Sequence, residues 1–337
     1  MADPIPSCLG GGGGGAAQTS ANSNLTTSFY HTTHGLAVLT WSRTLLTNAL
    51  SIDIHIQEST ASFRLRLTPW LFWKKKGSEA SHLSRATIEF HWDLSRAKFH
   101  SGPEPHSGFF VAVTYNRQML LLLGDSHHAA YSKTQSARLP KQPQLVMRRE
   151  HVFGRRSYAT RAVIAGQPRE ILIECGGRDE SRLSISIGGK RVLQVKRLRW
   201  KFRGNEKIIY DGVPVQVSWD VYNWLFDYEG GGEDDDDHRH AVFIFRFENE
   251  LGEEEECCGE KGLGAWKVFG LGLEGLEREK MKMKRKKSLL KTISSSSLSS
   301  SSLSSGSSSS VMEWASSEES EMQIAGGFSL LVYAWRR

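Results

Sequence analysis

Two segments that end in Trp-Asp constrain the fold of this chain more strongly than any other feature. In the stretch Val213–Phe226, apolar residues occupy every second position up to Trp219-Asp220. This period-two pattern is typical of a strand with one buried face. The segment Ile88–Phe99 repeats the pattern and has Trp92-Asp93 at the corresponding point. The chain is therefore predicted to be built around two related β-strands.

Further short apolar runs, separated by turn residues, extend the β pattern over most of the chain. Asn116-Arg117, Gly188-Gly189 and Asp211-Gly212 each form a two-residue turn signal between such runs. The predicted strands of the first set are Leu36–Trp41, Leu50–Ile56, Phe63–Leu67, Thr87–Trp92, Phe109–Tyr115 and Met119–Leu123. Those of the second set are Gln144–His151, Ala159–Ile164, Glu170–Glu174, Leu183–Ile187, Val192–Leu198, Val213–Trp219, Ala241–Phe247 and Phe328–Trp335.

The two sets follow the same order, which favours an internal duplication over chance similarity between strands. Leu50–Ile54 corresponds to Leu183–Ile187, and in each set a basic-apolar strand and then the Trp-Asp strand follow. With ten Trp and fifteen Phe, the chain can fill a sizeable core. We predict an all-β protein with a β-sandwich-like body made of two sequence-related halves, about 25–135 and 144–337. A closed barrel is the alternative.

Low-complexity segments divide the chain. Residues 1–24 are rich in Gly and small polar residues and are expected to be disordered, and residues 125–144 are expected to form a connector. An acidic, a basic and a Ser-rich stretch follow one another within residues 249–326. We expect them to form one long disordered insert before the last strand, so that the all-β body comprises residues 25–248 and 327–337.

The cysteines and the N-terminal segment indicate a cytoplasmic or nuclear protein. None of the four cysteines forms a Cys-x-x-Cys pair, which argues against a disulfide framework and a zinc finger. The first fifteen residues lack the basic and apolar regions of a secretory signal, so secretion is not expected. No run of eighteen apolar residues occurs, and no transmembrane segment is predicted.

Several motifs are distinctive in combination. They are Trp41–Leu46, Trp92–Ser95, Ala97–Phe99, Ser101–Pro105, Leu121–Asp125, Lys201–Asn205, Val213–Phe226, Val311–Ala315 and Gly327–Trp335. Together they resemble a plant-specific family of uncharacterised proteins, domain of unknown function 868, over roughly residues 25–337. The resemblance implies a plant protein of the cytosol or nucleus. It implies no activity, cofactor or functional residue.

No cofactor or metal site is predicted. Gly270–Gly275 matches the spacing G-x-G-x-x-G, but a dinucleotide site also requires a βαβ unit, and here the chain continues into a serine-rich run. His238 and His240 lie beside the acidic run Asp234–Asp237, which lacks the fixed geometry that selects a metal. The chain contains no hydrolase elbow, P-loop or zinc-protease motif.

Asp93 and Asp220 allow two interpretations. Two carboxylates could act as a general acid and base, as in glycoside hydrolysis. Alternatively, each could cap the turn after its strand by accepting backbone N–H bonds. A shared pocket would favour the enzyme, and burial in turn hydrogen bonds would favour the scaffold. With Trp92, Trp219 and Trp224, these aspartates are the candidate binding residues, the alternative being that the tryptophans belong to the core.

A basic run supplies the strongest functional hypothesis. Lys282, Lys284, Arg285, Lys286 and Lys287 precede two phosphorylation candidates, Ser288 and Thr292. The run could serve nuclear import, an anionic surface or a basophilic kinase, or it could be a solvated tether.

The sequence favours a non-enzymatic interaction or ligand-binding protein with a phosphorylatable basic and Ser-rich insert. Its partner through the insert would be an anionic surface, membrane lipid or nucleic acid, or another protein. The alternative is a β-sandwich enzyme that acts on carbohydrate or another small molecule through Asp93 or Asp220.

Overall fold

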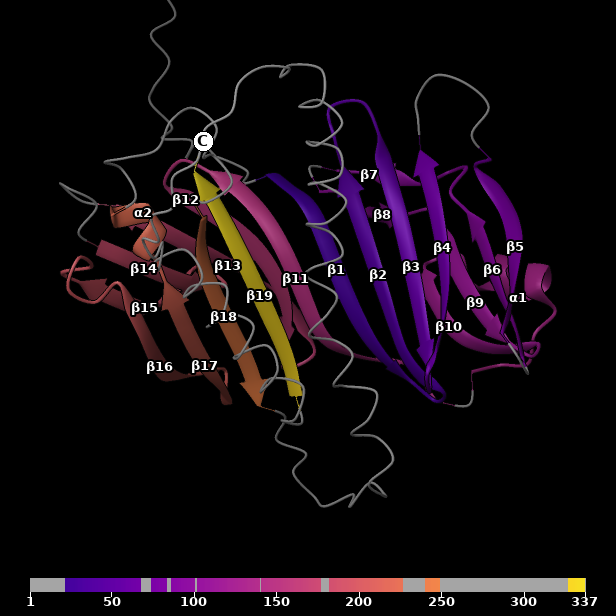
Figure 1. Cartoon of the computed structure of the whole chain (residues 1–337). Coiled ribbons are helices and arrows are strands. Elements are labelled where there is room, and N and C mark those ends of the chain that lie inside the picture. Colours follow the sequence, from indigo (N-terminus) through magenta and orange to yellow (C-terminus); the bar gives the residue numbers. More distant parts are fainter. Residues whose placement is uncertain are drawn as a thin grey trace, which may run out of the picture.

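Alternating burial along the strands gives each sheet one apolar face. In β4 (Ser59–Leu67), Ala61, Phe63 and Leu65 are buried, while Arg64 and Arg66 between them are exposed. Because successive side chains of a strand point to opposite faces, this pattern requires a second layer over the apolar side. The computed structural model describes residues 22–67, 74–83, 86–100, 102–139, 141–176, 182–226, 240–248 and 327–336, and within them it is almost entirely β (Figure 1).

The first half of the chain contributes ten strands and one helix. They are β1 (Asn22–Thr32), β2 (Gly35–Arg43), β3 (Asn48–Ile56), β4, β5 (Lys76–Leu83), β6 (Ala86–Asp93), β7 (Lys98–Phe99), β8 (Pro105–Ser107), β9 (Phe110–Tyr115), β10 (Gln118–Gly124) and α1 (His127–Thr134).

The second half contributes the remaining elements. They are β11 (Gln144–Gly154), β12 (Ser157–Ile164), β13 (Gln167–Gly176), β14 (Arg182–Ile187), β15 (Lys190–Lys196), β16 (Arg203–Tyr210), β17 (Val213–Asp220), α2 (Tyr222–Phe226), β18 (His240–Glu248) and β19 (Gly327–Arg336).

The three predicted turns are confirmed. Asn116-Arg117, Gly188-Gly189 and Asp211-Gly212 all have positive φ at both residues, and each joins two antiparallel strands. Positive φ at both central positions is the requirement of the type I′ turn, whose twist matches that of the flanking strands. The turn residues therefore set the register of the β9–β10, β14–β15 and β16–β17 hairpins.

A single nine-stranded sheet runs through both halves, in the order β16-β17-β18-β19-β11-β1-β2-β3-β4 (Figure 1). Strand β11 joins the halves, because it pairs antiparallel with β1 and parallel with β19. Two four-stranded sheets, β10-β9-β6-β5 and β12-β13-β14-β15, complete the two layers. Each of these sheets has two distinct edge strands in the part of the chain that the structure describes, so the body is a sandwich and not a closed barrel.

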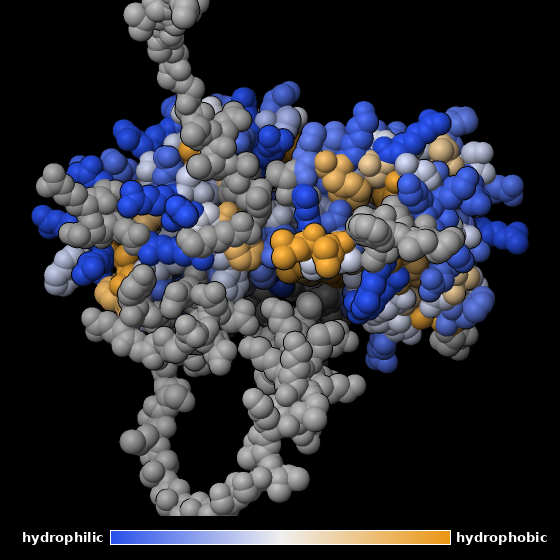
Figure 2. All heavy atoms as spheres, turned by 90° about the horizontal axis from the view of Figure 1, so that it is seen from above, coloured by the Kyte–Doolittle hydropathy of each residue, from blue (hydrophilic) through white to orange (hydrophobic). Residues whose placement is uncertain are grey.

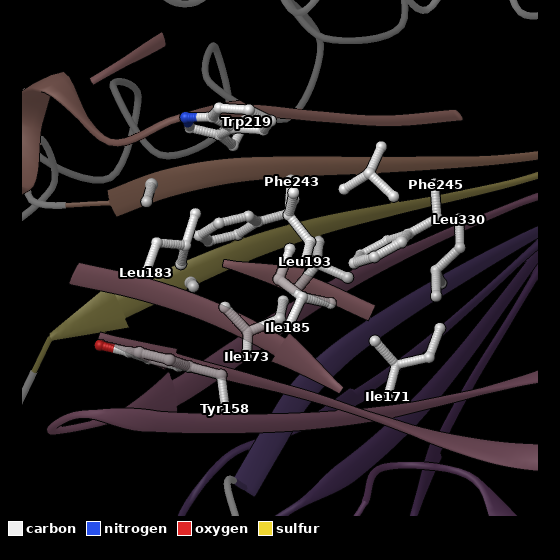
Figure 3. Packing of buried hydrophobic residues seen from close by; sticks show 14 of the residues in the cluster. Tyr158, Ile171, Ile173, Leu183, Ile185, Leu193, Trp219, Phe243, Phe245 and Leu330 are labelled. Atoms are coloured by element: carbon white, nitrogen blue, oxygen red, sulfur yellow. The ribbon is translucent and has the colours of Figure 1, made fainter. Parts of the chain in front are cut away.

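Each half has its own core. In the first, buried residues of β2, β3 and β4 pack against those of β6, β9 and β10. In the second, residues of β12 to β15 pack against those of β17, β18 and β19, as with Ile173 and Phe243 in Figure 3. The strand register places both cores on the same face of the nine-stranded sheet. Leu39 of the first core and Val152 of the second core both lie on that face. The body is therefore two sandwiches that share one sheet.

Strand pairing is equivalent in the two halves, in agreement with the predicted duplication. In the first half β6 pairs with β9 and β9 with β10, and in the second half β17 pairs with β18 and β18 with β19. The strand before each Trp-Asp strand is also equivalent, since Lys76 pairs with Asp93 and Arg203 pairs with Asp220. The last strand returns to the sheet between β18 and β11, as expected.

Three details differ from the expectations. Strands β1, β5, β7, β8 and β16 were not predicted, and of these β5 and β16 are mostly exposed and lack apolar alternation. The expected connector 125–144 contains helix α1, whose Ala130 packs on Phe110, Ala112 and Met119 of the small sheet. Strand β1 begins at Asn22, within the segment expected to be disordered. Residues 1–21 and the expected insert 249–326 lie outside the described residues.

The topology of the last strand predicts the outcome of chain cleavage. Glu248 of β18 pairs with Gly327 of β19, and β19 is hydrogen-bonded on both sides. If a specific protease site is introduced within residues 249–326 and cut, the C-terminal fragment should stay bound, because β19 supplies Leu330 and Val332 to the core. Size-exclusion chromatography under native conditions checks this, with denaturant as the control that separates the fragments. A fragment that elutes alone without denaturant would contradict the topology.

Candidate functional site

The two Trp-Asp strands carry the same contacts in both sandwiches. The indole Nε1 of Trp92 donates to the carbonyl oxygen of Lys74 at 2.8 Å, and that of Trp219 donates to the carbonyl oxygen of Lys201 at 3.0 Å. Both bonds span 18 residues. The two rings are 5% and 4% exposed, so they are core residues whose single polar atom has a partner.

A glycine lies beneath each indole ring. A Cβ atom added to Gly77 would lie 2.7 Å from a ring carbon of Trp92, and one added to Gly204 would clash with the ring of Trp219. These glycines are needed because the ring occupies the space of a side chain. The strand pattern does not single out these glycines, but a repeated spacing does: Trp73-Lys74 precedes Gly77, and Trp200-Lys201 precedes Gly204.

Each aspartate of the pair caps the turn after its strand. Asp93 Oδ1 accepts the backbone N–H of Ser95 at 2.9 Å, and Asp220 Oδ1 accepts that of Tyr222 at 3.0 Å. Asp220 is 1% exposed, and its Oδ2 also accepts two bonds from Arg203, from Nη2 at 2.6 Å and Nε at 2.8 Å. These are the contacts of the turn-capping interpretation.

The structure does not bring the candidate binding residues into one site. Asp93 and Trp92 belong to the first sandwich, whereas Asp220, Trp219 and Trp224 belong to the second. Trp224 is 3% exposed, stacks on Tyr158 at 5.0 Å and donates to the carbonyl oxygen of Ala334 at 3.1 Å. Ligand binding by these five residues stays a prediction, and their geometry is that of packing.

A buried ion network, which sequence reasoning missed, occupies the joint between the sandwiches. Arg148 of β11 contacts Glu104 at 2.7 Å and Glu150 at 2.6 Å, and Glu150 in turn accepts a bond from the Thr160 hydroxyl at 2.6 Å. Glu150 and Thr160 are buried. The register places Arg148 and Glu150 on the core face of β11, beside Ser28 and Thr26 of β1. The apolar cores are thus separated by a polar seam.

Charge and burial shift the pKa values of two groups in this seam. Burial alone would lower the pKa of Arg148, but the carboxylates of Glu104 and Glu150 raise it above its ordinary value. Burial, and then the charge of Glu104, raises the pKa of Tyr30. The raised pKa values favour the charged form of Arg148 and the neutral form of Tyr30.

Other predicted site residues fall into two groups. His240 lies in β18, where its ring is 4.5 Å from that of Trp335 and 5.5 Å from that of Tyr333. The basic run, which includes Lys282, Lys284, Arg285, Lys286 and Lys287, and the candidates Ser288 and Thr292 lie outside the described residues. In the part of the chain that the structure describes, no three His, Cys, Asp or Glu side chains are grouped to hold a metal ion. No helix among the described residues is long and apolar enough to cross a bilayer.

The fold and the repeated Trp-Asp corner define a double β-sandwich protein with two related halves. Comparison with known families identifies it further: the chain belongs to the family of plant proteins of unknown function that carries domain of unknown function 868, whose model matches residues 21–336. No curated protein and no solved structure matches the chain significantly.

The contact between glycine and indole predicts a strong effect of a small substitution. Gly204→Ala should lower the free energy of unfolding by about 1–3 kcal/mol, because the added methyl group overpacks the space under Trp219. Gly176→Ala is the matched control, since no atom lies within 4 Å of a Cβ at that position. Urea denaturation measures both variants. Equal stability of the two would show that the ring does not need the glycine.

The polar seam predicts a contrast between a buried and an exposed ion pair. Arg148→Met should destabilise the fold by about 3 kcal/mol, because it leaves Glu104 and Glu150 without their counter-charge. Lys207→Met is the control, since its pair with Glu248 is half exposed and should contribute less than about 1 kcal/mol. Thermal unfolding of both variants at neutral pH checks the difference. A similar loss in the two would mean that the seam contributes no more than a surface pair.

Proposed function

We propose that the chain is a non-enzymatic interaction protein whose double sandwich serves as a scaffold for the basic run Arg278–Lys291. The observation that carries this proposal is the pairing of Glu248 with Gly327. It fixes both ends of residues 249–326 at one point of the nine-stranded sheet. The entropic cost of closing a loop rises only slowly with its length, so a hairpin can carry so long a segment without losing its register.

The chemistry of the run supports an anionic partner. Arg278–Lys291 contains eight basic residues and one acidic residue. Each basic residue near an anionic membrane surface contributes about 1 kcal/mol, which makes such a run sufficient for reversible attachment. Nucleic acid or an acidic protein offers the same charge. Ser288 lies within the run, where a phosphate would add about two negative charges and weaken the attachment.

The environment of the aspartates supports a scaffold over an enzyme. Asp220 is engaged by Arg203 and by the N–H of Tyr222, and Asp93 by the N–H of Ser95. A general acid or base needs a proton-transfer partner within hydrogen-bond reach in an accessible site. Repetition of the same turn in both sandwiches is the behaviour of a structural device. The proposed place of action of the protein is the plant cytoplasm or nucleus.

The test is binding as a function of salt. The full chain should bind vesicles that contain phosphatidylserine, or duplex nucleic acid, at low salt and release them as salt rises. Replacement of Lys284–Lys287 by Ala should weaken binding at least tenfold. Ser288→Glu should weaken it less, and Ser307→Glu is the matched control, because it adds the same charge outside the basic run.

Co-sedimentation and fluorescence anisotropy across a salt series measure these affinities. Absence of binding at low salt, or equal binding by the parent and the Lys284–Lys287 variant, would reduce the run to a tether.

A further inference from the structure

The connection between β2 and β3 presents two leucines to solvent. Leu45 is 104% exposed and Leu46 is 74% exposed. Their turn is fixed by its own hydrogen bonds: Thr44 N–H donates to the Thr47 carbonyl at 2.8 Å, and Thr47 N–H donates to the Thr44 hydroxyl at 3.0 Å. Adjacent exposed leucines on a rigid turn contribute nothing to the core, so their apolar surface is available to a partner.

Basic side chains lie at the same end of the first sandwich as this tip. Arg43 precedes it, is exposed and donates to the carbonyl of His100 at 2.8 Å. The exposed lysines 74, 75 and 76 lead into β5, at the same end of the first sandwich, because β4 ends at Leu67 beside Asn48 of β3. Figure 2 looks onto this end and shows hydrophobic side chains among strongly hydrophilic ones.

The second sandwich repeats the combination of one large apolar residue and basic neighbours. Trp200 is 86% exposed and lies between the exposed residues Arg199 and Lys201. Its turn is held by N–H bonds from Trp200 and Lys201 to the carbonyl of Arg197, at 2.9 and 3.2 Å. The carbonyls of Lys74 and Lys201 accept equivalent bonds from the indoles of Trp92 and Trp219. The residues that precede these lysines, Trp73 and Trp200, therefore correspond in sequence.

Strand directions place both tips at one end of the nine-stranded sheet. β11 and β19 are parallel and all other neighbours in this sheet are antiparallel. The C-terminal end of β2 and the N-terminal end of β16 therefore lie at the same end of the sheet. Leu45-Leu46, which follow β2, and Trp200, which precedes β16, lie at that end. β18 ends and β19 begins at the opposite end, where residues 249–326 are attached.

We propose that this end of the strands docks on an anionic phospholipid bilayer, with Leu45, Leu46 and Trp200 inserted at the interface. Leucine gains free energy on transfer to the acyl region, and Trp is enriched at the level of the headgroups. The surrounding lysines and arginines meet the lipid phosphates. Nucleic acid fits less well, because leucines cannot stack on bases as aromatic residues do. Five strands of the sheet separate the two apolar tips, so they do not form the single apolar core of a protein interface, whereas a bilayer can accept each tip separately.

The test uses the full chain with vesicles of phosphatidylcholine with and without phosphatidylserine. The double variant Leu45→Ser/Leu46→Ser should bind anionic vesicles about 30-fold more weakly, and Trp200→Ser about tenfold more weakly. Ile209→Ser is the matched control: Ile209 is 75% exposed but lies near the end of β16, at the opposite end of the sheet, so its affinity should not change. All four positions are exposed, so unfolding midpoints should stay equal to that of the parent.

The same series in a Lys284–Lys287→Ala background separates this surface from the basic run. Residual vesicle binding that is lost with Leu45→Ser/Leu46→Ser supports the docking surface. The docking proposal is overturned if the double variant and Ile209→Ser bind vesicles with the same affinity. It is also overturned if the Lys284–Lys287 variant has no residual vesicle binding, or if the protein binds duplex nucleic acid through this surface and binds no vesicles. Failure of the basic run alone leaves the dependence on Leu45 and Leu46 unchanged.

Discussion

The ladder of hydrogen bonds on both sides of β11 is the interaction on which the body of this protein depends. β11 pairs antiparallel with β1 along one edge and parallel with β19 along the other. One strand of the second half thus joins the strands of both halves into one sheet. Without it, each sandwich would expose an unpaired edge strand, which is a template for association with other chains. Polar side chains on the core face of β11 then keep the two apolar cores apart, because a buried Arg148 requires Glu104 and Glu150 beside it.

The same set of contacts occurs in both halves. In each sandwich an indole lies on a glycine, donates to a carbonyl 18 residues upstream, and precedes an aspartate that caps a turn. A duplicated fold retains such a set because its members depend on one another. The ring needs the glycine, the turn needs the carboxylate, and the turn positions the carbonyl segment that the ring binds. The halves differ elsewhere: Asp220 forms an ion pair with Arg203, and residues 249–326 lie between the last two strands of the second half.

Much of the fold could be predicted from the sequence, because half-buried strands alternate visibly and type I′ turns require particular residues. The Val213–Asp220 strand and the Gly188-Gly189 turn were clear for these reasons. β5 and β16 were not, since an exposed edge strand has no apolar face to show. The turn-capping geometry of Asp93 and Asp220 was one of the two interpretations that the sequence allowed. The seam could not be foreseen, because the burial of Arg148 depends on Glu104, which is 44 residues away in the chain.

The position of β19 has a consequence for biosynthesis. The first sandwich has all of its strands once β10 has been made, so its core can form while the rest of the chain is being translated. The second sandwich cannot, because β19 lies between β18 and β11 and supplies Leu330, Val332 and Ala334 to its core. Until β19 has been translated, β18 and β11 each have an open edge. An open edge strand is a template for pairing with another chain, so this part of the protein is exposed to association until β19 takes its place, and removal of β19 would be as damaging as loss of any other central strand.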